Sequence, residues 1–325
     1  MQTIALGQTG LTPSRLGLGL AALGRPGYIN LGHAQDLQHD YDLLRMQKRA
    51  FAVFDAALQA GITYFDAARS YGEGERFLGA WLAIRGLPPG RVIVASKWGY
   101  RYTAGWQVQA EHHEIKEHSL EVLQGQADQS RGILGKHLRI YQIHSATLQS
   151  GVLDDAEVIA ELARLRESGW QIGLTLSGVG QAATLAKART IAPDGVPLFS
   201  VVQATWNIME RSCGEALAEA HAAGLGIVIK EALANGRLTQ RNPEAVALHE
   251  QAARLGTTSD ALALAAVLAQ PWADVVLSGA VTLEQLHSNL AALQLTLDEE
   301  AWTALEGLRE PADVYWQRRA ELAWN

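Results

Sequence analysis

Eight short apolar runs recur along the chain, and nearly all are separated by segments with the apolar spacing of helices. Strands that alternate with helices pair in parallel, through right-handed crossover connections. Eight such units fit a closed (β/α)8 barrel, the TIM barrel, better than the alternative, an open doubly wound sheet. The predicted strands are RLGLGL, ITYFDAA, RVIVASK, LRIYQIH, QIGLTLSG, LFSVVQA, LGIVIK and DVVLSG.

Short apolar segments on either side of Gly7–Gly10 predict a β-hairpin ahead of the first barrel strand. Gly61, Gly169 and Gly224 each stand between a helical pattern and the next strand, where a left-handed helix cap is expected. We expect residues 1–325 to form a single domain. Helical patterns cover residues 43–60, 156–168, 215–223, 243–255 and 259–269, and excursions from the barrel cover 24–42, 98–114 and 311–325.

Composition excludes several classes of function. The formal net charge is -7 and no block of lysine and arginine is present, so we expect no nucleic-acid partner. No stretch approaches the roughly 18 apolar residues that a membrane-spanning helix requires. Cys213 is the only cysteine, which rules out an intrachain disulfide and favours a reducing cytoplasm. We interpret Cys213 as a small residue at a helix start rather than a reactive thiol.

Polar residues stand at the ends of seven predicted strands. The strands of a parallel barrel all end on one face, and functional groups gather there. The sequence therefore predicts a functional face at this end. The seven residues are Asp66, Lys97, His144, Ser177, Gln203, Lys230 and Ser278.

Asp66, Tyr71, Lys97 and His144 form a candidate acid/base centre. A free tyrosine has a pKa of about 10, which a nearby ammonium lowers, and Lys97 is the candidate ammonium. Asp66 would keep Lys97 charged, and His144 would hydrogen-bond the same substrate oxygen as Tyr71. No nucleophile accompanies these groups, which suits carbonyl reduction or alcohol oxidation. For Tyr71 and Asp66 alone, a hydrogen bond within the core is the competing interpretation.

The segments DAARSYG, VIVASKWG and IYQIHS resemble the tetrad motifs of the aldo-keto reductase superfamily, and the resemblance extends from Met1 to about Leu293. It includes LGLGL, LSGVG, QATWN and SGAVTLEQLHSNLAAL. The resemblance implies an NAD(P)-dependent oxidoreductase that acts on a small carbonyl or alcohol substrate, with Tyr71 as general acid/base. It implies Asp66, Lys97 and His144 as the other members of the tetrad.

The resemblance also implies a nicotinamide cofactor extended across the strand ends. Ser177 and Gln203 would hold its carboxamide, and Trp206 would stack on the nicotinamide ring. The loop 233–238 would wrap the pyrophosphate, with backbone amides and Arg237 as donors. The predicted cofactor-binding residues are Gly19, Ser177, Gln203, Trp206, Lys230, Leu233, Asn235, Gly236, Arg237, Gly279, Ala280, Gln285 and Asn289.

The segment 278–285 carries no cation, and Gln285 stands where relatives that favour NADPH commonly have arginine or lysine. A 2′-phosphate rewards a charged partner, so we expect NAD(H) to bind at least as well as NADP(H). An arginine from a distant loop, or the Thr282 hydroxyl, remains an alternative phosphate ligand.

Two further alternatives concern metals and regulation. HEIKEH, residues 113–118, is one residue too long for a zinc-protease helix motif, so we expect no metal site. Barrels of this kind also serve as regulatory β subunits of potassium channels, which is the alternative function.

No sequence feature specifies an oligomeric state. The aromatic residues of the excursions, which are Tyr28, Tyr100, Trp106, Trp316 and Trp324, suit a polyol, a sugar lactol or an aromatic aldehyde equally.

Overall fold

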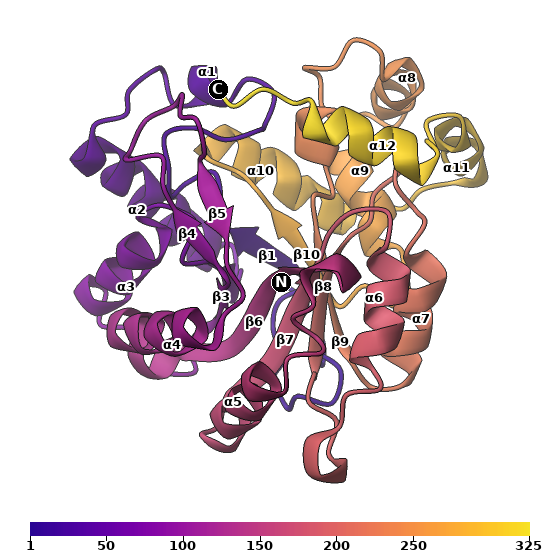
Figure 1. The fold of residues 1–325 in the computed structure, drawn as a ribbon. Coiled ribbons are helices and arrows are strands. Elements are labelled where there is room, and N and C mark those ends of the chain that lie inside the picture. Colours follow the sequence, from indigo (N-terminus) through magenta and orange to yellow (C-terminus); the bar gives the residue numbers. More distant parts are fainter.

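Eight parallel strands close into a barrel in the computed structural model, which describes residues 1–325 (Figure 1). The barrel order is β1-β10-β9-β8-β7-β6-β3-β2, so barrel strands that are consecutive along the chain are neighbours in the sheet. This confirms the predicted (β/α)8 architecture, and each predicted apolar run supplies one strand. The barrel strands are β1 (Leu16–Gly19), β2 (Tyr64–Asp66), β3 (Ile93–Trp98), β6 (Leu138–Ala146), β7 (Gln171–Leu176), β8 (Val201–Thr205), β9 (Gly226–Lys230) and β10 (Val275–Ser278).

Helices surround the barrel, and their apolar faces pack on the outside of the strands (Figure 1). The strands are buried on both faces, which explains why they appear in the sequence as nearly continuous apolar runs. None of the helices combines the length and apolar character needed to cross a membrane. The helices are α1 (His33–Asp36), α2 (Leu43–Gln59), α3 (Gly74–Ile84), α4 (Leu120–Leu134), α5 (Ala156–Glu167), α6 (Gln181–Ala188), α7 (Gly214–Ala222), α8 (Val246–Arg254), α9 (Ser259–Leu268), α10 (Leu283–Ala291), α11 (Glu299–Glu306) and α12 (Ala312–Ala320).

The predicted helix ends are mostly confirmed. Gly61, Gly169 and Gly224 have φ values of 92°, 101° and 94°, the left-handed conformation expected of glycine caps. The predicted start of α8 at residue 243 is wrong by three residues. The Asn242 side chain accepts a hydrogen bond from the backbone of Glu244 at 3.1 Å and holds a turn there instead.

The excursions contain short elements that the sequence did not predict. Residues 24–42 include α1, and residues 311–325 include α12. β4 (Tyr100–Tyr102) and β5 (Glu114–Lys116) form a separate antiparallel pair, so the centre of HEIKEH is a strand rather than a helix. Five short 3-10 helices also occur, η1 (Gly135–His137), η2 (Leu148–Ser150), η3 (Pro193–Gly195), η4 (Ala234–Gly236) and η5 (Ala292–Gln294).

The predicted N-terminal hairpin closes the amino end of the barrel. Ile4 N donates to the Pro13 carbonyl and Leu6 N to the Leu11 carbonyl, both at 2.9 Å. Leu6 and Leu11 are buried in the small core that fills the barrel interior. The hairpin meets the start of β9, since Gln8 N donates to the Gly224 carbonyl at 2.9 Å. The carboxyl ends of the strands are therefore left for a functional site.

A substitution at Gly7 tests whether the hairpin closes the amino end of the barrel. A Cβ at Gly7 would lie 2.3 Å from the backbone nitrogen of Gly226, whereas a Cβ at Gly10 would meet nothing within 4 Å. Both glycines have positive φ, so alanine would be strained at either position. Only at Gly7 would its Cβ also clash with neighbouring backbone. We predict that Gly7→Ala lowers the free energy of unfolding by about 1 to 3 kcal/mol more than Gly10→Ala. Equal urea midpoints for the two variants would contradict the closure.

Candidate functional site

A cavity of about 520 Å³ lies at the carboxyl ends of the strands. Six of the seven predicted polar strand ends line it, and the seventh, Lys97, is buried beneath and bonded to Asp66. The structure thus brings together the predicted functional face. The six are Asp66, His144, Ser177, Gln203, Lys230 and Ser278.

The three excursions meet over this cavity. The backbones of Tyr28 and Asn325 exchange two hydrogen bonds of 3.1 Å, and the rings of His113 and Trp324 stack with centroids 3.7 Å apart. In Figure 1 the segment after α12 ends beside α1, and Ala34 N donates to the Asn325 side chain at 3.2 Å. The excursions therefore form the wall of the cavity that faces the strand ends.

Lys97 and Asp66 form an ion pair in which both side chains are almost fully buried. The Lys97 ammonium also donates to the Ala67 carbonyl at 2.9 Å, and Gln203 Nε2 donates to Asp66 Oδ1 at 2.9 Å. Burial lowers the pKa of Lys97, and the Asp66 carboxylate opposes that effect. Asp66 thus holds an ammonium and an amide in fixed positions at the base of the cavity.

Tyr71 lies over this ion pair. The Lys97 Nζ is 4.7 Å from the centroid of the Tyr71 ring, and the His144 ring stands edge-on at 5.6 Å. Burial, and then the Asp66 carboxylate, raise the pKa of Tyr71 well above 10. The expected lowering of this pKa by Lys97 is therefore wrong for the free protein, because the ring is buried and Asp66 already compensates the ammonium. Tyr71 is protonated at neutral pH.

His144 is a neutral imidazole in this environment. Burial, and then the positive charges of Lys97 and Arg25, hold its pKa well below 6.5. The Ser70 hydroxyl lies 3.4 Å from His144 Nδ1, and the Tyr100 ring packs 4.8 Å from the imidazole. Because Tyr71 and His144 are both neutral and both line the cavity, each can hydrogen-bond an uncharged oxygen placed between them.

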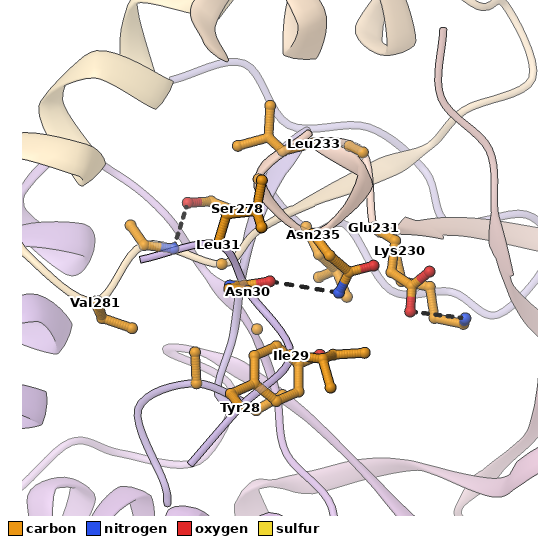
Figure 2. A pocket seen from close by; sticks show the side chains of 18 of the residues that line it. Tyr28, Ile29, Asn30, Leu31, Lys230, Glu231, Leu233, Asn235, Ser278 and Val281 are labelled. Atoms are coloured by element: carbon orange, nitrogen blue, oxygen red, sulfur yellow. Dashed lines mark hydrogen bonds and ion pairs between the residues drawn. The ribbon is translucent and has the colours of Figure 1, made fainter. Parts of the chain in front are cut away.

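The middle of the cavity is formed by η4 and the segment 28–31. Asn235 has φ 56°, and its Oδ1 atom is buried without a hydrogen-bond partner. Leu31 N donates to the Asn235 carbonyl at 3.0 Å, and the side chains of Asn30 and Asn235 meet at 3.4 Å (Figure 2). A cavity of this size, lined by both polar and apolar groups, fits a large ligand such as a dinucleotide.

The far end of the cavity is acidic. Asp260 and Glu284 line it, and the Asn289 amide donates to Asp260 Oδ2 at 2.9 Å when its oxygen accepts from Ser278. The Gln285 side chain accepts from the backbone of Val281 at 2.9 Å. Arg241 is the one cation lining this end, and both of its terminal nitrogens are bonded to Asp36.

Most predicted cofactor-binding residues line the cavity, but two do not. Trp206 faces the helix layer and packs edge-on against Trp272, with ring centroids 5.4 Å apart. Arg237 makes two hydrogen bonds to Glu310, of 3.1 and 2.5 Å. The predicted stacking role of Trp206 and pyrophosphate role of Arg237 therefore disagree with the structure. Those that line the cavity are Gly19, Ser177, Gln203, Lys230, Leu233, Asn235, Gly236, Gly279, Ala280, Gln285 and Asn289.

Sequence reasoning missed two ion pairs in the wall of the cavity. Arg25 pairs with Glu114 at 3.0 Å, and Arg319 of α12 pairs with Glu231 at 2.6 Å. The partners lie 89 and 88 residues apart, so no local spacing could have joined them. No group of three or more His, Cys, Asp or Glu side chains is placed to hold a metal ion.

Comparison with known proteins gives a consistent result. Residues 15–310 match the model of the aldo/keto reductase family. The chain is 26% identical to L-galactose dehydrogenase of Arabidopsis thaliana, over 94% of each protein. It is also 26% identical to NADH-specific methylglyoxal reductase of Escherichia coli, over 95% of this chain and 99% of the relative. The solved structure of the aldo-keto reductase AKR11C1 from Bacillus halodurans matches with a TM-score of 0.70 and 21% identity, over 95% of this chain and 97% of that one.

Lys97→Met tests the buried ion pair. Removing the ammonium leaves the Asp66 carboxylate buried and uncompensated, so we predict a loss of about 3 to 5 kcal/mol in the free energy of unfolding. Arg101→Met is the matched control, because Arg101 and Glu117 form a pair in which both side chains are exposed. Its expected cost is below about 1 kcal/mol. Denaturant unfolding measures both, and similar costs would contradict the geometry described for Asp66.

Proposed function

Because the chain belongs to the aldo/keto reductase family, whose members are nicotinamide-dependent oxidoreductases acting on small carbonyl compounds, we propose that it interconverts an aldehyde or ketone and its alcohol with Tyr71 as general acid/base. The observation that carries this proposal is the convergence of Tyr71, His144 and the Lys97–Asp66 pair at one end of the cavity. The relatives are oxidoreductases, which does not favour a regulatory channel subunit.

A nicotinamide cofactor supplies the hydride when bound. Ser177 and Gln203 would hold its nicotinamide end, because both line the cavity and Gln203 is bonded to Asp66 of the tetrad. The backbone of residues 233–236 would hold its middle. Gly279 and Asn289 would hold its adenosine end.

The neutral phenol of Tyr71 is suited to donate a proton to the substrate oxygen during reduction. As a carbonyl becomes an alkoxide its oxygen becomes far more basic, so a phenol of raised pKa can still protonate it. The Lys97 ammonium then stabilises the phenolate that remains, since it lies 4.7 Å from the ring. Asp66 fixes the ammonium there, and the neutral His144 hydrogen-bonds the same oxygen.

Tyr71→Phe tests the proton donor. The substitution keeps the ring and removes the hydroxyl, so we predict that kcat falls by about 10²- to 10⁴-fold while the Kd for NADH stays within about twofold. Methylglyoxal and L-galactose are the first substrates to assay, because the names of two relatives specify them. Tyr41→Phe, outside the cavity lining, is the control. An unchanged kcat in Tyr71→Phe would remove Tyr71 from the mechanism.

The acidic far end of the cavity predicts which of the two reduced cofactors, NADH or NADPH, binds more tightly. Glu284 and Asp260 would repel a 2′-phosphate, and Arg241 is bonded to Asp36, so we predict tighter binding of NADH than of NADPH. Glu284→Lys should narrow the difference by about tenfold, whereas Glu299→Lys on α11 should not. Quenching of tryptophan fluorescence gives the Kd values. Tighter binding of NADPH by wild-type protein would instead indicate Arg241 as a phosphate ligand.

A further inference from the structure

Lys230, Glu231 and Arg319 form a charged cluster in the wall of the cavity. Lys230 is the last residue of β9, Glu231 follows it, and Arg319 reaches them from α12. Figure 2 shows Lys230 and Glu231 next to each other at one side of the cavity. All three line the cavity, and the Glu231 side chain is only 8% exposed. Lys230 is among the predicted cofactor-binding residues, and the proposed proton transfer at Tyr71 does not use any of the three.

The Glu231 carboxylate is fully engaged inside the cluster. Arg319 Nε lies 3.1 Å from both of its oxygens, and Arg319 Nη2 donates to Oε1 at 2.6 Å. The Thr205 hydroxyl lies 3.3 Å from Oε2, and Thr205 in turn accepts from Lys230 Nζ at 2.7 Å. Burial raises the pKa of Glu231, but Arg319 and Lys230 outweigh that effect and lower it to about 2.

Glu231 is held in this position by its backbone as well. Its φ is 54°, a left-handed conformation that is uncommon for a residue with a side chain. The Asn207 amide donates to the Glu231 carbonyl at 2.9 Å and so stabilises the turn. A strained residue that its surroundings hold in place is typical of a functional site.

The hydrogen-bonding capacity that remains in the cluster consists only of donors. Lys230 Nζ has the Thr205 hydroxyl as its one hydrogen-bond partner, and Arg319 Nη1 has none. Glu231 Oε1 lies 3.9 Å from Lys230 Nζ, beyond a hydrogen bond. The cluster holds two cations and one carboxylate. Its free N–H groups and its excess positive charge therefore match an anionic oxygen group rather than a hydroxyl donor.

We propose that Lys230 and Arg319 bind a carboxylate on the substrate, so that this reductase acts on carbonyl compounds that carry an acid group, or on the corresponding hydroxy acids. This proposal rests on the proposed function, because it assigns a second contact to the substrate of Tyr71. A neutral aldehyde would displace water and leave the N–H groups of Lys230 and Arg319 without hydrogen-bond partners. A site built in this way binds a neutral substrate much less well than one with a carboxylate.

Burial alone does not remove the charge on Lys230 at neutral pH. Desolvation lowers its pKa to about 8, against the opposing effect of Glu231. The ammonium thus remains available to a carboxylate at pH 7. A phosphate of the cofactor presents the same anionic oxygens, so cofactor binding must be measured separately from substrate preference.

The test compares 4-oxobutanoate with butanal, which differ by the carboxylate. For the wild-type protein we expect kcat/KM with NADH to be at least about tenfold higher for 4-oxobutanoate. In Lys230→Met the ratio of the two kcat/KM values should fall by at least about tenfold, and Lys230→Arg should restore part of it. Lys187→Met, a surface lysine paired with Asp154, is the control and should leave the ratio unchanged. Thermal melting verifies that each variant is folded.

A second measurement separates the carboxylate site from the proposed function. Titration calorimetry of succinate into the NADH-loaded protein should show binding that weakens at least about tenfold in Lys230→Met. If neither aldehyde is reduced and succinate still binds in this way, the proposed function fails and the carboxylate site stands. An unchanged kcat/KM ratio in Lys230→Met overturns the carboxylate site. A weaker Kd for NADH in that variant, with the ratio unchanged, assigns Lys230 to a cofactor phosphate instead.

Discussion

The buried ion pair of Lys97 and Asp66 is the interaction on which the site depends. Moving two charges out of water costs several kcal/mol per ion, which only close and well-bonded geometry can offset. The barrel provides that geometry, because β2 and β3 are neighbours and Gln203 of β8 reaches Asp66 at 2.9 Å. The pair therefore ties three strands together at the base of the cavity, directly beneath Tyr71.

Burial also decides the protonation states above this pair. It raises the pKa of Tyr71 and lowers that of His144, so both side chains are neutral at pH 7. A neutral phenol next to a fixed ammonium can release a proton once a basic oxygen appears beside it. In the proposed mechanism, the Tyr71 phenol is thus a proton donor whose conjugate base the Lys97 ammonium stabilises in advance, which is electrostatic preorganisation rather than a lowered resting pKa.

Much of the fold, and the convergence of the polar strand ends on one cavity, could be predicted because they follow local rules. The apolar runs, the glycine caps and the polar strand ends all depend on residues close in sequence. Trp206 shows where such reasoning failed. It follows the last residue of β8, so the position of a strand-end side chain did not fix its direction, and it packs against Trp272 instead. The pairs Arg237–Glu310 and Glu231–Arg319 depend on partners 73 and 88 residues away, which no local pattern specifies.

Deuterium transfer from labelled NADH tests most directly whether the cavity supports hydride transfer to a carbonyl carbon. The protein is mixed with a reducible aldehyde and with NADH deuterated at one or the other face of nicotinamide C4, and the alcohol product is analysed by mass spectrometry. A single fixed orientation of the nicotinamide predicts that one labelled face gives deuterium at the former carbonyl carbon and the other gives none. Absence of deuterium from both, or equal transfer from both, would contradict the account.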